Sequence, residues 1–251
     1  MGQSNQRIIA ILNLLKKTYP DAKIVLRYGN PWELLVAVIL SAQCTDVMVN
    51  KVTEKLFKKY PTLDDYVNAK VDEFEQDIKS TGFYHNKAKN VLAAAKLIKE
   101  KYRGKIPKTM AEMLTIPGVA RKTANVVLGN AHGVVEGIAV DTHVHRLSQR
   151  LRLVDLGAIG GKKEILFKRP GLYQGPALKY PKARPFSGLE VDYKKDANPN
   201  KIEQELMTVV PKSDWFKTTY LLIDHGRAVC KAQNPDCVHC VLNKLCPSSR
   251  I

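Results

Sequence analysis

The stretch LTIPGVARKTANVVLGNAHG, residues 114–133, decides how the rest of the chain is interpreted. Pro117 and Gly118 predict a tight turn, because proline fixes φ and glycine accepts backbone conformations that other residues avoid. Apolar residues at helical spacing follow from Ala120 onwards. We therefore expect one helix to end near Leu114, then a tight turn, and then a second helix that starts near Ala120.

This arrangement predicts a phosphate-binding turn. Glycine lets the backbone come close to a partner, and the first turn of a helix presents amides that have no acceptor inside the helix. Such amides, together with the helix dipole, bind anions without a charged side chain. They would hold a nucleic-acid backbone without reading its sequence. The candidate DNA-binding residues of the turn are Pro117, Gly118, Val119, Ala120 and Arg121.

Lys122 stands in the first turn of the second helix. The positive end of the helix dipole, the neighbouring Arg121 and partial burial are all expected to disfavour its ammonium form. A neutral amine is what a Schiff-base nucleophile needs. From the residues alone, a solvated surface lysine remains the alternative.

Asp141, in the stretch AVDTHVHRLSQRL, precedes a further helical pattern. Its simplest role is an N-cap, which accepts a hydrogen bond from the following turn. A carboxylate can also stabilise a developing cationic sugar and help to activate an amine. Both roles can hold at once. His143 and His145 are interpreted as structural or phosphate-facing rather than catalytic.

Four of the five cysteines fall in the last 22 residues, with the spacing C-x6-C-x2-C-x5-C. They are Cys230, Cys237, Cys240 and Cys246. Four thiolates on one short segment can hold a single inorganic centre, either an iron–sulfur cluster or zinc. Only one C-x2-C pair is present and Pro247 follows the last cysteine, which favours a [4Fe–4S] cluster. The odd cysteine number argues against a disulfide framework, and Cys44 is expected to be a small core residue.

The charge balance predicts a polyanionic partner. Forty Lys and Arg residues against 24 Asp and Glu residues give a net charge of +16, and nucleic acid is the commonest polyanion that such a field attracts. No apolar run approaches the roughly 18 residues of a membrane span, and the N-terminus is too polar for a secretory signal. We therefore expect a cytoplasmic protein.

Helical periodicity runs through most of the chain, and no alternating stretch is long enough to predict a sheet. We expect an all-α protein. Thr109 and Glu112 predict a capping box for a short helix. The other expected helices cover an apolar face over 8–15 and the stretches 31–40, 45–61, 71–83, 84–102, 200–211 and 215–230.

Residues 156–198 break the helical pattern. The segment around them is rich in glycine, proline and lysine, and it carries Phe167, Tyr173, Tyr180, Phe186 and Tyr193. Lysines neutralise phosphate and aromatic rings stack on bases, so this basic insertion is a candidate DNA-contacting arm. The alternative is a disordered or surface-packed insertion.

Three motifs in this order, LTIPGVARKTANVVLGNAHG, IAVDTH and the cysteine tail, resemble endonuclease III, a helix-hairpin-helix DNA glycosylase family with an iron–sulfur cluster. The resemblance covers about 5–154 and 200–247. Ala120 stands where family members often have a second glycine. The resemblance implies a six-helix domain over 24–134, a cluster-bearing domain made of 1–23 with 135–251, and a DNA-binding cleft between them.

The resemblance also implies a function: base excision repair of oxidised pyrimidines in duplex DNA by a monomer, in a prokaryotic nucleoid. Lys122 would attack the sugar C1′, expel the base and cut the strand by β-elimination, with Asp141 supporting the attack. The target nucleotide is flipped out, and Gln43 and Phe83 would fill the gap, although the family more often has leucine at the second position. The alternatives are a monofunctional mismatch glycosylase, a non-catalytic DNA-binding iron–sulfur protein and an iron–sulfur electron carrier.

Overall fold

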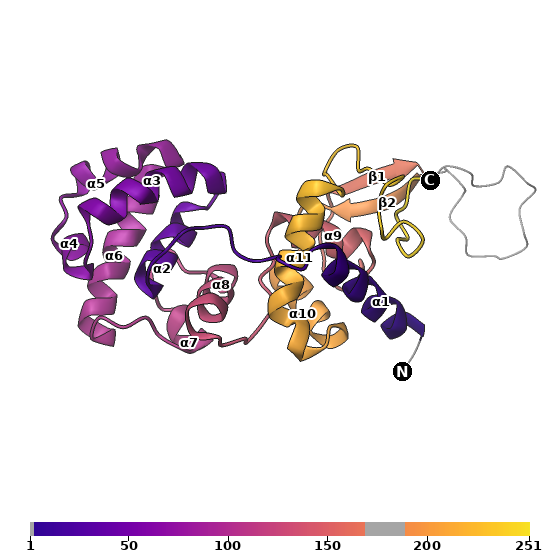
Figure 1. Cartoon of the computed structure of the whole chain (residues 1–251), viewed down its shortest axis with the longest axis horizontal. Coiled ribbons are helices and arrows are strands. Elements are labelled where there is room, and N and C mark those ends of the chain that lie inside the picture. Colours follow the sequence, from indigo (N-terminus) through magenta and orange to yellow (C-terminus); the bar gives the residue numbers. More distant parts are fainter. Residues whose placement is uncertain (1–2, 169–188) are drawn as a thin grey trace, which may run out of the picture. The chain divides into compact units, whose positions relative to one another are not determined.

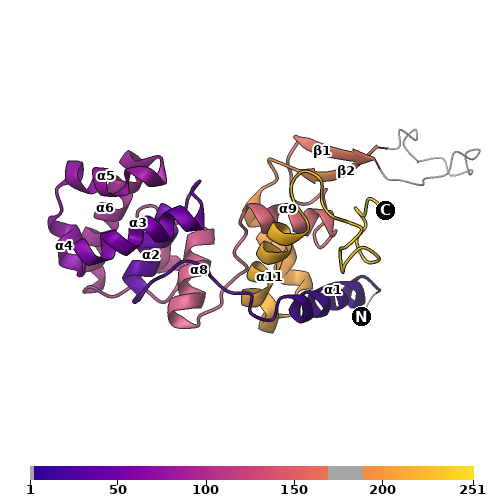
Figure 2. The ribbon, with the colours of Figure 1, turned by 45° about the horizontal axis from the view of Figure 1, so that its top comes forward.

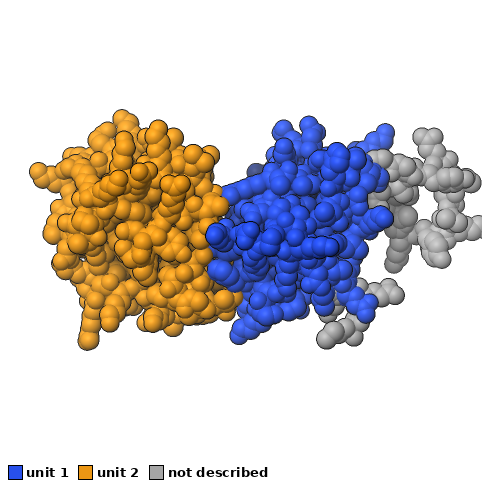
Figure 3. Space-filling model, in the orientation of Figure 1, with its two compact units in different colours: residues 1–23, 140–251 blue, residues 24–139 orange. Residues whose placement is uncertain are grey.

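The computed structural model describes residues 3–168 and 189–251. The chain forms two compact units (Figure 3). The hairpin unit comprises residues 24–139, and the cysteine unit comprises residues 1–23 with 140–251. Regular structure is almost entirely helical, which confirms the predicted all-α fold (Figure 1). Within the described ranges, no helix is long and apolar enough to span a lipid bilayer.

The hairpin unit is built from seven α-helices and a short 3-10 helix. They are α2 (Pro31–Leu40), α3 (Asp46–Lys59), α4 (Leu63–Asn68), α5 (Val71–Ile78), η1 (Lys79–Thr81), α6 (Tyr84–Tyr102), α7 (Met110–Met113) and α8 (Arg121–His132). The helices predicted over 31–40, 45–61 and 84–102 are present. The pattern predicted over 71–83 is divided between α5 and η1.

Helix α2 forms the centre of the hairpin unit. Every residue of 34–40 is buried, because a helix that is apolar on all sides is stable only inside a core. It contacts α3, α6 and α8. The Asn30 side chain caps its start by accepting the Glu33 N–H at 2.9 Å, and Pro31 occupies the first turn as predicted.

The short helix α7 shows half of the predicted capping box. The Thr109 hydroxyl accepts the Glu112 N–H at 3.3 Å. The Glu112 carboxylate accepts from the same hydroxyl at 2.8 Å, whereas a full capping box would place it on the Thr109 backbone N–H. Helix α7 is four residues long, so this cap defines where the hairpin begins.

The cysteine unit combines the N-terminal helix with the C-terminal half of the chain. Its elements are α1 (Gln3–Thr18), α9 (Thr142–Arg150), β1 (Glu164–Lys168), β2 (Leu189–Lys194), α10 (Pro199–Val209), η2 (Lys212–Asp214) and α11 (Trp215–Ala228). The Arg7 guanidinium on α1 donates to the carbonyls of Leu151, Arg152 and Leu245, at 2.8, 2.9 and 3.1 Å. This one side chain joins both ends of the sequence to the end of α9.

The insertion contains a small antiparallel sheet that the sequence did not predict. Strands β1 and β2 pair with Glu164 opposite Lys194, and an irregularity falls between Ile165 and Leu166. The strands have five and six residues, too short for a clear alternating pattern. Phe167 is buried while Leu166 is exposed, so the sheet has one inner and one outer face.

The described part of the 156–198 segment is packed on the cysteine unit. Strand β2 contacts α9 (Figure 2), and Asp192 and Ala197 are buried. These ends therefore form a surface-packed insertion. Tyr173, Tyr180 and Phe186 lie outside the described residues, so the DNA-arm hypothesis stays a prediction.

Candidate active site and cysteine centre

The turn between α7 and α8 is built around Gly118. Its φ is +78°, in the left-handed region that glycine adopts without strain. A Cβ atom at this position would also come within 2.9 Å of the Asn90 Cβ on α6. Buried Val119 closes the turn by donating its N–H to the Ile116 carbonyl at 3.1 Å. Glycine is thus required both by backbone conformation and by close packing.

The start of α8 presents amides to an anion. Ala120 is the N-cap residue and makes no side-chain hydrogen bond, because alanine has no acceptor. Its carbonyl accepts the Ala124 N–H at 2.9 Å. The N-cap residue thus supplies no side-chain acceptor to the first-turn amides of α8, and amides at helix N-termini are groups that bind anions. Pro117 and Arg121 are half-buried beside this position.

Lys122 follows in the first turn of α8, and its side chain is exposed. The partial burial expected from the sequence is therefore wrong. The physical reason is the helical register: α8 packs Thr123 and the apolar residues after it into the core beside α2, which leaves Lys122 on the open side. An exposed amine at this position is accessible to a partner that binds the turn.

Asp141 caps the start of α9, as predicted. Its Oδ1 accepts the Val144 N–H at 2.8 Å, and its carbonyl accepts the His145 N–H at 2.8 Å. Oδ2 makes no hydrogen bond with the residues that the structure describes. The carboxylate is therefore held in a fixed direction by one oxygen, while the other is available to a ligand.

The two histidines near Asp141 have structural contacts. His143 is half-buried, and its Nδ1 lies 3.4 Å from Arg146 Nη2. A Cβ at Gly226 on α11 would come within 2.6 Å of this Nδ1, so the ring packs tightly against α11. His145 Nε2 lies 3.0 Å from the Ala197 carbonyl. A DNA contact from His143 stays a prediction.

Gln43 and Phe83 stand at two loop tips of the hairpin unit. Gln43 follows α2 with φ +53°, and Phe83 precedes α6 with φ +48°. Phe83 is 63% exposed, so it is not a core residue. Non-glycine residues in this conformation are uncommon, and they are concentrated at functional sites. Both side chains are exposed at the surface of the hairpin unit, where a partner can contact them.

Two of the four cysteine sulfurs, those of Cys230 and Cys240, lie near N–H donors. Arg150 Nη1 donates to Cys230 Sγ at 3.4 Å. The Leu242 N–H donates to Cys240 Sγ at 3.4 Å, and His225 Nε2 lies 3.5 Å from the same sulfur. N–H donors of this kind stabilise sulfur ligands in their thiolate form.

His225 is a buried ring beside the Cys240 sulfur. It is 1% exposed, and burial lowers its pKa to about 4, so the ring is neutral near pH 7. The Tyr19 hydroxyl lies 3.1 Å from its Nδ1. If the hydroxyl donates to Nδ1, the ring proton is on Nε2 and faces the sulfur; we assign this tautomer from the hydrogen-bond network.

The donor set fits an inorganic centre, although the side chains do not converge on one point. Among the described residues, no three or more His, Cys, Asp or Glu side chains are placed to hold a metal ion. Burial raises the pKa of Cys230, Cys240 and Cys246, the last to about 12, and neighbouring cysteines raise the pKa of Cys240 and Cys246 further. A bound cation reverses this effect by stabilising thiolate.

Two buried arginines of α9 were missed from the sequence. Arg146 Nη2 donates to the Cys230 carbonyl at 2.9 Å, and Arg150 Nη1 donates to the Lys231 carbonyl at 2.6 Å. Arg150 also forms a buried ion pair with Asp192 of β2. The available signal was the i, i+4 spacing of these arginines on a helix whose other face is apolar.

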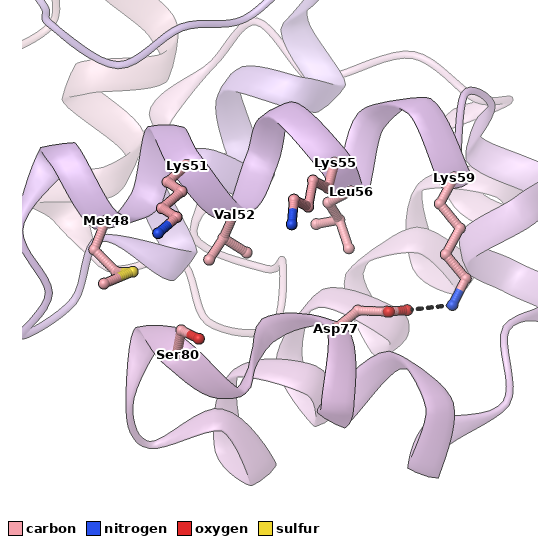
Figure 4. Close-up of a pocket in the computed structure, with 8 residues that line it drawn as sticks. All are labelled: Met48, Lys51, Val52, Lys55, Leu56, Lys59, Asp77 and Ser80. Carbon is pink, nitrogen blue, oxygen red and sulfur yellow. Dashed lines mark hydrogen bonds and ion pairs between the residues drawn. The ribbon is translucent and has the colours of Figure 1, made fainter.

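A basic groove in the hairpin unit was also missed. It lies between α3 and the α5–η1 segment, and the lining residues are Met48, Lys51, Val52, Lys55, Leu56, Lys59, Asp77 and Ser80 (Figure 4). Lys59 is paired with Asp77 at 2.7 Å at one end of the groove. Lys51 and Lys55 have no ion-pair partner among the described residues. The signal was three lysines at four-residue intervals, which share one helix face.

The candidate residues thus fall into two groups. The hairpin unit holds the turn, Lys122, Gln43 and Phe83, and the cysteine unit holds Asp141, His143 and the four cysteines. The chain combines an all-α fold with a glycine-centred turn, a lysine in the first turn of the following helix and an aspartate N-cap. The sequence model of the HhH-GPD superfamily base excision DNA repair proteins matches residues 36–165, which assigns the chain to that class of DNA repair protein.

Full-length relatives narrow the class to one family. The chain is 43% identical over 250 residues to endonuclease III of Synechocystis sp., with 100% of this chain and 96% of the relative covered. It is 42% identical to endonuclease III of Bacillus subtilis, with 94% and 89% covered. The chain belongs to the endonuclease III family. The prediction of a base excision repair enzyme, a DNA glycosylase and lyase, is thereby confirmed.

Solved structures agree with this assignment. A trapped endonuclease III–DNA covalent intermediate superposes with a TM-score of 0.79 at 39% identity and covers 98% of this chain and 96% of that one. A thermostable thymine-DNA glycosylase gives a TM-score of 0.73 at 21% identity. The second likeness concerns the fold alone.

Proposed function

We propose that the protein removes oxidised pyrimidines from duplex DNA with Lys122 as the nucleophile. The observation that carries the proposal is the place of Lys122, exposed in the first turn of α8 directly after the Gly118 turn. A relative of 39% identity forms a covalent intermediate with DNA. The same capacity in this chain needs an accessible amine beside a phosphate-binding turn, and Lys122 meets that requirement.

The reaction would proceed in balanced steps. The Lys122 amine attacks the sugar C1′, and the bond to the damaged base breaks with its electron pair. The base leaves as it gains a proton. The amine adduct opens to a Schiff base, which loses a proton from C2′ and releases the 3′ phosphate by β-elimination. The mechanism therefore requires no external oxidant or reductant.

Asp141 would act through its second carboxylate oxygen. Oδ1 is fixed on the Val144 N–H, so the direction of Oδ2 is set before substrate binds. A carboxylate held in this way stabilises the positive charge that develops on the sugar. It also accepts a proton from an attacking amine. The proposal therefore gives Asp141 a supporting role and Lys122 the role of nucleophile.

Substrate binding would depend on the turn and the two loop tips. Phosphate oxygens would accept hydrogen bonds from amides of the Gly118–Arg121 turn other than that of Val119, which is bonded to the Ile116 carbonyl. Gln43 and Phe83 would enter the space that the flipped nucleotide leaves, because an empty space in the stack costs stacking free energy. The exposed Phe83 ring suits this role, since aromatic rings stack on bases.

We further propose that Cys230, Cys237, Cys240 and Cys246 hold a [4Fe–4S] cluster. When bound, the cluster would supply folding free energy by joining the C-terminal segment into one loop. The N–H groups of Arg150 and Leu242 directed at the sulfurs support thiolate ligands. Iron and sulfide in equal amounts with visible absorption are expected, and zinc in their place would refute the cluster. The cytoplasmic, nucleoid-associated location stays a prediction.

Borohydride trapping on a duplex that contains thymine glycol tests the nucleophile. The wild type should give a covalent adduct, Lys122→Ala should give none, and Lys105→Ala, an exposed lysine of the same unit, should behave as wild type. Base release without an adduct would indicate a monofunctional glycosylase. Neither adduct nor release with any of a panel of oxidised pyrimidines would indicate a DNA-binding protein without this activity.

A further inference from the structure

A buried lysine joins the two loops that carry Gln43 and Phe83. Lys87 lies in the first turn of α6 and is 5% exposed. Its Nζ donates to the Leu40 carbonyl at 2.8 Å and to the Thr81 carbonyl at 2.8 Å. Burial lowers its pKa. No carboxylate is paired with it among the described residues, so its partners are backbone carbonyls.

The two carbonyls mark where each loop begins. Leu40 is the last residue of α2, and Gln43 follows three positions later. Thr81 is the last residue of η1, and Phe83 follows two positions later. Carbonyls at the end of a helix have no partner within it. Lys87 thus satisfies a backbone group at the base of each loop.

Both loop tips have backbone conformations that must be held by their surroundings. Gln43 and Phe83 are non-glycine residues with φ of +53° and +48°. Such conformations persist only where neighbouring structure fixes them. The Ser41 hydroxyl bonds to the Val38 carbonyl at 2.8 Å, and the Thr81 hydroxyl bonds to the Ile78 carbonyl at 2.8 Å. These bonds fix each loop separately, whereas Lys87 fixes one loop to the other.

A lysine is unusual in this position. Burial of an ammonium group without a counter-charge opposes folding, and an apolar side chain of the same length would fill the space without that cost. It would leave both carbonyls without a donor. The neutral amine has two N–H groups and the ammonium has three, so the bridge between the loops does not depend on the charge.

We propose that Lys87 is a positioning residue that holds the Gln43 loop and the Phe83 loop at a fixed separation, so that the two side chains enter the DNA stack together. The inference rests on the proposed function in giving Gln43 and Phe83 that role. The inference goes beyond the proposed function because it assigns the alignment of both loops to one buried amine, which touches neither the substrate nor the reacting atoms.

Lys87→Met tests the bridge, because methionine keeps an unbranched apolar side chain as far as Cε and removes the amine that makes both hydrogen bonds. Lys89→Met is the matched control on an exposed position of the same helix. The wild type and both variants are compared on one lesion, first in duplex DNA and then in a single strand, where no stack has to be filled. We expect Lys87→Met to slow duplex cleavage on the order of 100-fold, with little change on the single strand and no effect of Lys89→Met.

A double-mutant cycle separates positioning from a general structural effect. In a background with Gln43→Ala and Phe83→Ala, the bridge has nothing to position, so Lys87→Met should add little further loss. Additive losses, or equal losses on duplex and single strand, would overturn the proposal. If Lys87→Met does not fold, Lys87→Gln, which keeps one donor group, takes its place in the same cycle.

Amide hydrogen exchange makes the test independent of activity. Loss of the bridge should lower protection at 41–44 and 82–84 together, while α8 keeps its protection. Unchanged protection at both loops in a folded variant would refute the bridge even if the enzyme is active. Joint loss of protection in a protein that never cleaves DNA would instead support the bridge and refute the proposed function.

Discussion

Substitution of Asp192 by asparagine should destabilise the cysteine unit strongly. The Asp192 carboxylate accepts from Arg150 Nε at 2.9 Å on each oxygen and from Arg150 Nη2 at 2.7 Å, and Arg250 Nη2 adds a bond at 3.2 Å. The side chains of Asp192 and Arg150 are 0% and 2% exposed. Asparagine has nearly the same shape but no charge. The change therefore removes the carboxylate that balances the charge of the buried Arg150 guanidinium.

The size of the effect follows from the burial. Removal of one partner of a buried ion pair costs about 3–5 kcal/mol, because the remaining charge loses its compensation. For a chain of this size about 1 kcal/mol corresponds to about 2–4 °C in melting temperature. We therefore expect the cysteine unit of Asp192→Asn to melt roughly 6–20 °C below the wild type.

The assay must report the cysteine unit separately, because a chain of two units need not unfold in one transition. Amide exchange in α9 and β2 gives that local signal, with circular dichroism for the whole chain. Glu164→Gln, an exposed acid on β1, is the matched control and should change stability by less than about 0.5 kcal/mol. Equal melting of Asp192→Asn and Glu164→Gln would show that the pair contributes no net stability.

Three further results are expected. Gly118→Ala should cost about 1–3 kcal/mol in denaturant unfolding and weaken DNA binding, because it adds strain and a close approach to Asn90. Lys51→Ala with Lys55→Ala should reduce the slope of log K against log salt for duplex binding by about 0.9 for each phosphate that is no longer neutralised. The stability of the wild type relative to Lys87→Met should rise with pH just below 10.5, because the lowered pKa of Lys87 makes the unfolded chain bind more protons there.

Matched variants make these results specific. Gly104 also has positive φ, but a Cβ there would meet only Leu63 Cδ2 at 3.8 Å, so Gly104→Ala measures the strain without the clash. Alanine at Lys89 and Lys96, two exposed lysines of α6, controls for the loss of net charge. If the slope of log K against log salt falls equally in the groove variant and in the α6 variant, the basic groove does not contact DNA. A flat difference in stability across this pH range would contradict the lowered pKa of Lys87.

The sequence predicted features whose causes are local. The turn at Pro117–Gly118, the start of α2 at Pro31 and the N-cap at Asp141 each depend on neighbours within four residues. Propensity and capping rules act over that distance. The cysteine spacing is local for the same reason.

Features that depend on distant partners could not be predicted. The burial of Asp192 requires Arg150, 42 residues earlier in the chain, and nothing near Asp192 marks it as a core residue. Lys87 binds the Leu40 carbonyl across 47 positions. Lys122 is exposed because α8 packs its opposite face against α2. A periodic pattern defines the faces of an element, but tertiary packing decides which charged residue is enclosed.

Lys87 and Arg150, two of the cations that the sequence analysis missed, solve one physical problem in different units. Functional side chains often lie on segments where a helix ends. The backbone carbonyls of such segments have no hydrogen-bond donor within the helix. Lys87 binds carbonyls at the Gln43 and Phe83 loops, and Arg150 binds those of Lys231 and Ala232 beside Cys230. A side chain with several donors can hold two irregular segments at once, which a single backbone bond cannot do. Loss of either cation should therefore disturb the presentation of its functional residues before it unfolds the helices around them.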